Sequence, residues 1–199
     1  MNLILVTGCP GSGKSGVSKY LSEKLNYPVL SKDSYKKQLF EEYGFRSSLE
    51  KKELDNKAET LFFKEVESKI KENTNIVVDK WAQGIEMFGK SILSKNVNLI
   101  VVRLVCKYVV LHERINKRIS SGDRPLSFLA INQYPIIDGK SIFIKEMTLE
   151  EVEEKANRPF SPNGIANLIE VDTTDFSHED NKILENIYDF VVNHLEKSQ

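Results

Sequence analysis

Apolar residues recur along this chain in short continuous runs, separated by longer stretches with helical spacing. The runs have the length of β-strands: Leu3–Thr7, Pro28–Ser31, Ile76–Asp79, Val97–Cys106 and Leu168–Asp172. Continuous rather than alternating runs are expected of strands that are covered on both faces. Three later stretches place apolar residues on one helical face: Leu49 to Ile70, Val109 to Ile119 and Ile183 to Leu195. This order predicts an α/β fold with a parallel sheet between two helical layers.

A glycine-rich stretch joins the first predicted strand to a helix whose face carries Val17, Leu21 and Leu25. It reads Gly8-Cys9-Pro10-Gly11-Ser12-Gly13-Lys14-Ser15, which fits the phosphate-loop pattern G-x-x-x-x-G-K-[ST] at every fixed position. Its glycines allow successive N–H groups to face one anion, and the helix start adds its positive end. We expect the stretch to bind nucleotide phosphates, with Lys14 on the β- and γ-phosphates and Ser15 on Mg²⁺. The alternative is a glycine-rich turn that binds nothing.

Acidic residues follow two of the predicted strands, where ligands of parallel sheets bind. Asp33 comes after the second strand and could accept a proton from an attacking hydroxyl; its other reading is a helix N-cap. Asp79 ends the third strand and could hold Mg²⁺, while a turn or cap is the alternative. Trp81 and Gln83, just beyond, are candidates for an acceptor pocket, and Trp81 could equally be ordinary packing.

Basic residues follow the fourth predicted strand. Arg114 and Arg118 are four positions apart and share one helix face, with Arg124 shortly after them. Arginines beside a phosphate site can neutralise charge that builds up on a transferring group. The alternative is a solvent-exposed basic helix face with no role in the chemistry. After the final strand, Thr173 lies in a loop that this architecture brings toward the nucleotide base.

The segment from Ser121 to Gly164 interrupts the alternation of strands and helices. It holds five turn-forming pairs: Arg124-Pro125, Tyr134-Pro135, Asp138-Gly139, Arg158-Pro159 and Ser161-Pro162. Within it we predict a short strand at Lys140–Lys145 and a helix at Leu149–Asn157 with a Thr148/Glu151 cap. We interpret residues 114–164 as a lid and insertion, either a cover for a substrate or a surface elaboration.

Length and composition narrow the class of protein. The 199 residues suit a single domain over 1–199, and a net charge of −1 gives no sign of a duplex-binding surface. Two cysteines make a disulfide framework unexpected, no apolar run reaches membrane-spanning length, and the N-terminus leads directly into a strand. We therefore expect a cytoplasmic protein without a signal peptide or a membrane anchor.

With these residues in place, the chain resembles the P-loop small-molecule and polynucleotide kinases over most of its length, except Ser121–Gly164. The nearest local pattern is that of polynucleotide 5′-hydroxyl kinases, and gluconate-type kinases, antibiotic phosphotransferases and zeta-type toxins share the framework. The resemblance implies a nucleoside-monophosphate-kinase-like P-loop fold. It also implies a general base at Asp33, a contact to the acceptor's phosphate at Lys36, and lid arginines at Arg114 and Arg118, the second on the ATP phosphates. Lys36 departs from the usual arginine and loses its bidentate fork, and Lys80-Trp81 replaces small polar residues.

The combined expectation is an ATP- and Mg²⁺-dependent phosphotransferase acting on a hydroxyl. Its acceptor is either a small molecule or a short single-stranded nucleic-acid end. A nucleotide-binding regulatory ATPase without an acceptor and a nucleoside monophosphate kinase remain as alternatives. Asn-Lys-x-Asp, by which GTPases read guanine, does not occur, and neither does a transporter-type Leu-Ser-Gly-Gly-Gln signature.

Overall fold

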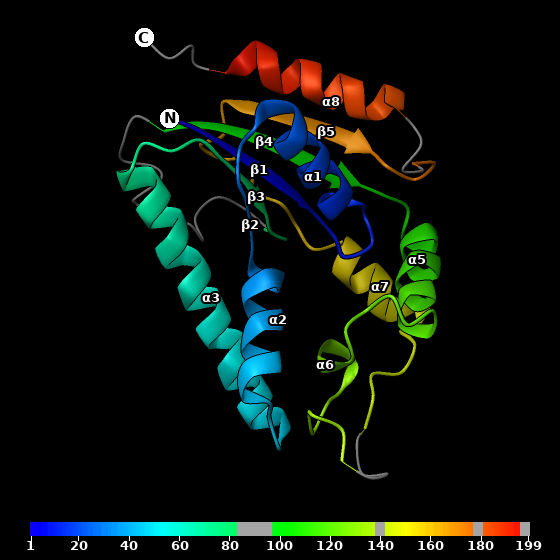
Figure 1. Cartoon of the computed structure of the whole chain (residues 1–199). Coiled ribbons are helices and arrows are strands. Elements are labelled where there is room, and N and C mark those ends of the chain that lie inside the picture. The colour runs from blue at the N-terminus through cyan, green and yellow to red at the C-terminus, as the bar shows by residue number, and fades with distance from the viewer. Residues whose placement is uncertain (83–96, 138–141, 177–180, 196–199) are drawn as a thin grey trace.

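A five-stranded parallel sheet forms the centre of the structure, a computed structural model that describes residues 1–82, 97–137, 142–176 and 181–195 (Figure 1). The strands are β1 (Asn2–Gly8), β2 (Val29–Ser31), β3 (Ile76–Asp79), β4 (Asn98–Val105) and β5 (Asn167–Asp172). Their order across the sheet is β2-β3-β1-β4-β5. The predicted α/β fold with a parallel sheet is therefore confirmed, and the strand predictions differ from the observed bounds only at their ends.

Successive residues of β1 point to opposite faces of the sheet, and both faces are covered. Leu3 and Leu5 pack with Phe62 and Val66 of α3 (Ser48–Lys71). On the other face of the sheet, Ile4 packs against α1 (Lys14–Leu25) and α8 (Asn181–His194). The residues that these helices bury there are Val17 and Leu21 of α1, and Leu184, Ile187 and Val191 of α8. In Figure 1, α8 and α3 lie on opposite sides of the sheet. Every residue of β1 is buried, as the continuous apolar run predicts.

A helical hairpin extends from the carboxyl edge of the sheet (Figure 1). It consists of α2 (Lys32–Tyr43) and the first half of α3, joined through Gly44, whose φ of 64° is left-handed. The Ser47 side chain accepts a hydrogen bond from the Glu50 N–H and caps α3. The Glu50 carboxylate accepts from the Arg46 N–H at 2.7 Å, one residue before the cap.

The segment after α5 (Tyr108–Ser120) packs against the end of this hairpin. It contains α6 (Leu126–Leu129), and Phe45 and Tyr134 exchange backbone hydrogen bonds of 2.7 and 2.8 Å. A small apolar core joins the segment to the hairpin: Phe40, Phe45, Phe128 and Ala130, with Leu54 and Tyr134 against them. The segment therefore lies over the hairpin rather than projecting freely from it.

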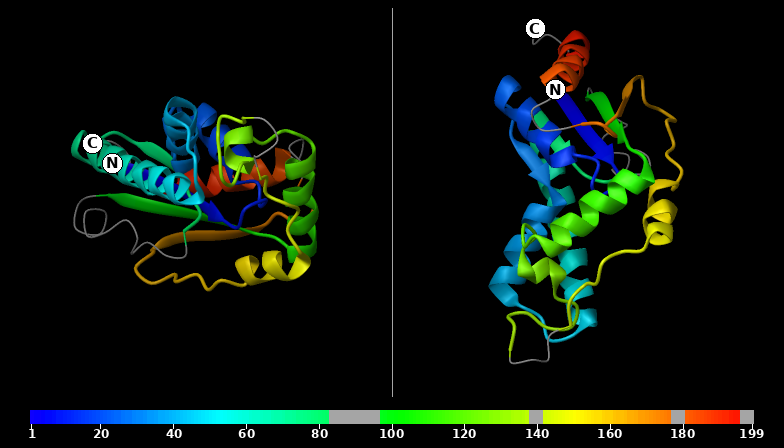
Figure 2. Two further views of the ribbon diagram at one scale, coloured as in Figure 1. Left: turned by 90° about the horizontal axis from the view of Figure 1, so that it is seen from below. Right: turned by 90° about the vertical axis from the view of Figure 1, so that its right-hand side faces the viewer.

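The helix predicted at Leu149–Asn157 is confirmed as α7 (Leu149–Ala156), with the Thr148/Glu151 capping box complete. It lies beside α5 in both views of Figure 2, and Leu111, Ile115 and Val152 fill the contact. The strand predicted at Lys140–Lys145 is wrong for its described part, residues 142–145. There Phe143 makes only an isolated antiparallel bridge to Ala130. Ala130 is the C-cap of α6, so the residues before it are helical and cannot extend the pairing.

Candidate functional site

The phosphate-loop residues connect β1 directly to α1. Gly8 has φ 149°, and a Cβ at this position would lie 2.4 Å from the Leu104 carbonyl oxygen, so only glycine fits. The Ser12 N–H donates to the Cys9 carbonyl at 3.1 Å and closes the turn. Gly13 stands at the N-cap of α1 with φ 92° and provides no side-chain cap within the described residues. The first amides of the helix therefore lack a side-chain acceptor, as an anion-binding helix start requires.

Lys14 and Ser15 lie at the carboxyl ends of β1 and β3. Ser15 Oγ donates to Asp79 Oδ2 at 2.8 Å, and Lys14 Nζ donates to the Cys9 carbonyl at 3.1 Å. Parallel pairing aligns Val6 with Asp79 and so brings the acid next to the loop. Burial raises the pKa of Asp79, against the effects of Lys14 and of the Ser15 hydrogen bond. Burial also lowers the pKa of Lys14, which Asp79 and Asp33 oppose.

The Ser15 hydroxyl and the Asp79 carboxylate are the oxygen ligands that Mg²⁺ prefers. Mg²⁺ is usually held by one or two protein carboxylates, with waters and substrate phosphates completing its shell. The described ranges contain no cluster of three or more acidic, histidine or cysteine side chains that would form an all-protein metal cage. The donor set therefore fits an ion shared with a bound phosphate.

Asp33 is exposed in the first turn of α2, and Ser31 rather than Asp33 occupies the N-cap position. Its charge acts on the pKa values of Lys14, Asp79 and Arg124, which places the carboxylate beside the phosphate loop. The capping alternative is thus removed by position. Asp33 is therefore not the N-cap of α2, and its charge acts on Lys14 of the phosphate loop.

The structure gives the paired arginines of α5 different surroundings. Arg118 is exposed, and its charge acts on both Lys14 and Asp79. Arg114 instead donates from Nη2 to the carbonyl oxygens of Thr174 at 3.1 Å and Phe176 at 2.9 Å. The arginine pair is therefore divided, with Arg118 near the phosphate loop and Arg114 holding the loop after β5.

Thr173 is fully buried, and its hydroxyl donates to the Val105 carbonyl at 3.0 Å. The side chain joins the ends of β5 and β4. In the same loop, the Phe176 ring lies 3.3 Å from where a Cβ of Gly13 would be. The loop after β5 therefore reaches the start of α1 through Phe176.

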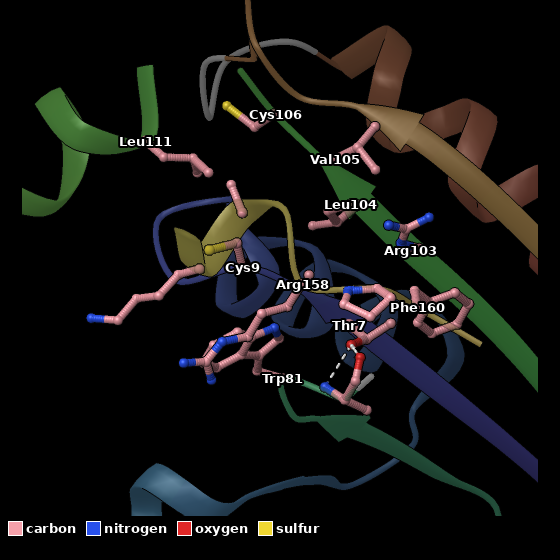
Figure 3. A pocket seen from close by; sticks show the side chains of 15 residues that line it. Thr7, Cys9, Trp81, Arg103, Leu104, Val105, Cys106, Leu111, Arg158 and Phe160 are labelled. Atoms are coloured by element: carbon pink, nitrogen blue, oxygen red, sulfur yellow. Dashed lines mark hydrogen bonds between the residues drawn. The ribbon is translucent and has the colours of Figure 1, made fainter. Parts of the chain in front are cut away.

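Trp81 lies beside the phosphate loop and lines a cavity of about 80 Å³ together with Cys9, Cys106 and Leu111 (Figure 3). The Thr7 hydroxyl positions this segment, because it accepts from the Ala82 N–H at 2.8 Å and donates to the Ala82 carbonyl. The Arg158 guanidinium lies 5.2 Å from the centre of the Trp81 ring. Gln83, the other residue predicted for an acceptor pocket, lies outside the described residues.

A network of charged side chains between α2, α3 and the end of β3 was not foreseen in the sequence. Lys36 Nζ lies 3.0 Å from Asp55 Oδ1, Lys32 pairs with both Asp55 and Glu59, and Lys80 pairs with Glu59 at 2.8 Å. Lys51, Asp55 and Glu59 repeat at intervals of four on α3, so they share one helix face. This spacing of charged residues was the only sequence signal for the network. It is weak, because a charged helix face usually indicates only solvent exposure.

In the part of the chain that the structure describes, no helix combines the length and apolar character needed to cross a membrane.

Comparisons with known proteins place this geometry in context. The family model described as AAA domain matches residues 4–129. A shikimate kinase from Dehalococcoides mccartyi is 32% identical over 117 residues, which are 57% of this chain and 58% of that protein. A crystal structure of a protein from Chloroflexus aurantiacus has a TM-score of 0.77 at 24% identity and covers 98% of both chains. A gluconokinase from Sinorhizobium meliloti has a TM-score of 0.60 at 16% identity, over 96% of this chain and 92% of its own. At these identities the two structures show a shared fold.

Proposed function

We propose that this chain, which belongs to the AAA domain family, is an ATP- and Mg²⁺-dependent phosphotransferase that phosphorylates a hydroxyl of a small-molecule acceptor. The observation that carries this proposal is the Ser15–Asp79 pair, at 2.8 Å, beside Lys14 and an α1 start without a side-chain cap. The resemblance to a shikimate kinase and a gluconokinase supports a small hydroxylated acceptor.

The phosphate loop has the groups needed to bind the triphosphate. The amides at the start of α1 donate to phosphate oxygens, and Lys14 exchanges its hydrogen bond with the Cys9 carbonyl for one with the β- or γ-phosphate. Ser15 and Asp79 are the residues that would hold Mg²⁺, which when bound offsets the charge of the phosphate oxygens. Because Asp79 is buried and Lys14 is half-buried, water screens their interactions with the phosphates only in part.

Asp33 and Arg118 act on the transfer itself. The Asp33 carboxylate orients the acceptor hydroxyl and takes its proton as the oxygen attacks the γ-phosphorus. The bond from that phosphorus to the bridging oxygen breaks, and ADP leaves with the electron pair. Arg118, which reaches Lys14 and Asp79 electrostatically, offsets the charge that develops on the transferring group.

The deciding experiment is an ADP-release screen with Mg·ATP and acceptors of different classes. The panel contains polyols, hydroxy acids, sugar phosphates, aminoglycosides, nucleosides, nucleoside monophosphates and an oligonucleotide with a free 5′-hydroxyl. We expect ADP release that depends on a small hydroxylated acceptor, with labelled phosphate recovered on it. Phosphorylation of the oligonucleotide alone would instead favour the polynucleotide kinases that the Asp33-x-x-Lys36 spacing resembles. ATP binding without ADP release for any acceptor would point to a regulatory nucleotide-binding protein.

A further inference from the structure

A carboxylate of α3 joins the two strand ends that carry the acids of the proposed reaction. Glu59 Oε1 accepts a hydrogen bond from Lys80 Nζ at 2.8 Å, and Glu59 Oε2 lies 3.4 Å from Lys32 Nζ. Lys32 directly precedes Asp33, and Lys80 directly follows Asp79. We call Lys32, Glu59 and Lys80 the strand-end link. Each oxygen of Glu59 takes one lysine, and each lysine is the chain neighbour of an acid assigned to the transfer.

The pairing of β2 with β3 brings the two lysines to neighbouring positions. Ser31 is the register partner of Asp79, so Lys32 and Lys80 each follow one member of the same pair. Like charges at neighbouring positions repel one another. The charge of Asp33 also acts on Asp79, so the acids repel one another in the same way. The two strand ends would therefore separate more readily without an anion between the lysines.

Lys80 is the buried member of the strand-end link. Its side chain is 7% exposed, and its Nζ lies 5.5 and 5.3 Å from the ring centres of Phe62 and Phe63. A lysine is rarely buried without a partner of opposite charge, and Glu59 is that partner. The hydrogen bond from Lys80 lowers the pKa of Glu59, and the charges of Lys80 and Lys32 lower it further against the effect of burial. Glu59 is therefore ionised at neutral pH.

Packing alone would not require an ion pair at this place. Replacing a buried ion pair with apolar side chains of similar size is often neutral or stabilising, because both charges lose their hydration in the pair. An apolar residue at position 80 would pack on Phe62 and Phe63 without that loss. It would not provide the directional hydrogen bond that fixes the end of β3 relative to α3.

We propose that Glu59 is a positioning residue for phosphoryl transfer: through Lys32 and Lys80 it holds Asp33 and Asp79 at the separation that the reaction requires. This inference rests on the proposed phosphotransferase function and adds to it a residue that acts through its neighbours. Transfer depends on alignment of the attacking hydroxyl, which Asp33 orients, with the γ-phosphate beside Asp79. A displacement of about 1 Å in such an arrangement can lower the rate roughly 10²-fold.

The first test compares Glu59→Gln with Glu65→Gln. The two side chains lie on α3 with similar exposure, 37% and 39%, but Glu65 pairs with Lys69 of the same helix. We expect Glu59→Gln to lower kcat roughly tenfold or more, because the hydroxyl and the phosphate lose their alignment. The Kd for Mg·ADP and the KM for the acceptor should stay within a few-fold of wild type, and Glu65→Gln should change none of the three. Calorimetry and single-turnover transfer to the best acceptor of the ADP-release panel measure these properties.

A double variant keeps the test valid if Glu59→Gln unfolds because Lys80 has lost its partner. Glu59→Gln/Lys80→Met removes both charges, and Lys32 keeps Asp55 as a partner at 3.0 Å. We expect this variant to melt no lower than wild type, yet to lose transfer roughly tenfold, which loss of a merely stabilising ion pair would not do. Lys32→Met breaks the strand-end link at β2 and should also lower kcat, whereas Lys32→Arg keeps the charge and should restore it.

Trp81 allows a second test that needs no turnover. It is the single tryptophan of the chain and follows Lys80 directly, so its fluorescence reports on the end of β3. In the Mg·ADP complex, acrylamide quenching of Trp81 should rise about twofold in Glu59→Gln and in the double variant, because the strand end opens locally. Quenching in Glu65→Gln should match wild type.

Wild-type kcat in the folded double variant, an equal loss of kcat in Glu65→Gln, or unchanged Trp81 quenching in Glu59→Gln would overturn the inference. Wild-type protein that phosphorylates no acceptor would refute the phosphotransferase function alone. In that case the Trp81 comparison still decides whether Glu59 holds the end of β3.

Discussion

The phosphate-loop region and the proposed acceptor side of the site differ in the groups that form them. The first uses backbone amides, Lys14 and Ser15 at the start of α1, and Asp79 at the end of the fully buried strand β3. The second uses charged side chains of α2 and α3 with Arg124, assembled over the aromatic core that the 126–134 segment completes. In the proposed function, triphosphate binding therefore depends mainly on residues 8–15, with Asp79 brought beside them by the pairing of β1 with β3, while acceptor binding depends on packing between distant segments.

Lys14→Ala should produce the largest effect, because it removes the charge that the phosphate loop aims at the triphosphate. We expect phosphoryl transfer to fall roughly 10³-fold, as when a preorganised electrostatic group is lost from an active site. The melting temperature should not fall, since the substitution also removes a half-buried charge whose desolvation is unfavourable. Lys19→Ala, at an exposed position of the same helix, is the control. Near-normal turnover in a folded Lys14→Ala protein would contradict the phosphate-loop assignment.

Arg118→Ala and Arg114→Ala should separate a rate effect from a stability effect. Arg118→Ala is expected to lower kcat roughly 10²–10³-fold with little change in the KM for the acceptor. Arg114→Ala leaves the Thr174 and Phe176 carbonyls without their donor and should lower the free energy of unfolding by about 1–3 kcal/mol. Denaturant unfolding and steady-state kinetics on both variants test this. The reverse distribution of effects would show that Arg114 is the arginine acting on the transfer.

Asp33→Asn should lower the transfer rate by roughly 10²-fold and leave nucleotide binding nearly unchanged, because an amide cannot take up the hydroxyl proton. A loose transition state allows some residual rate. Single-turnover transfer and a nucleotide titration measure the two properties, and Glu41→Gln on the same helix controls for the loss of a surface charge. Unchanged transfer in Asp33→Asn would direct the search for the base to Asp79.

The smallest expected effect is a pH dependence of acceptor binding. Lys51 is protonated below its pKa of about 8 and neutral above it. The KM for an anionic acceptor should therefore rise several-fold between pH 7.5 and 9.5, because Lys51 loses its charge beside Lys36, Arg124 and Asp55. In Lys51→Arg the rise should disappear, because arginine stays charged throughout this range. An identical rise in Lys51→Arg would assign the dependence to another group.

The comparison between the two regions also explains what the sequence could predict. The run Ile76–Asp79 matches β3 residue for residue, and the glycines of the phosphate loop adopt the turn expected of them. The Thr148/Glu151 cap was predictable because capping depends on residues three positions apart. In each of these cases the signal and the structure lie in the same short stretch.

Features that depend on distant segments could not be predicted in this way. Lys51 looks like a solvent-facing charge on α3, and only the packing of residues 126–130 buries it. Sequence spacing does not distinguish Arg114 from Arg118, but in the structure Arg114 donates a hydrogen bond to the loop after β5. The short strand predicted at Lys140–Lys145 carries strand-like residues, yet its described part has a partner over a single bridge. Local propensity cannot supply a pairing partner.

The side-chain amide of buried Asn116 on α5 pairs with the Met147 backbone, much as a backbone peptide group would. Its Oδ1 accepts from the Met147 N–H at 2.8 Å and its Nδ2 donates to the Met147 carbonyl at 2.9 Å. This contact closes the intervening chain into a loop whose two ends are fixed at one point. The entropy of such a loop changes slowly with length, by about 0.6 kcal/mol for each doubling. A change in the length of this loop is therefore expected to cost little loop-closure entropy while the contact between Asn116 and Met147 keeps α5 and α7 in place.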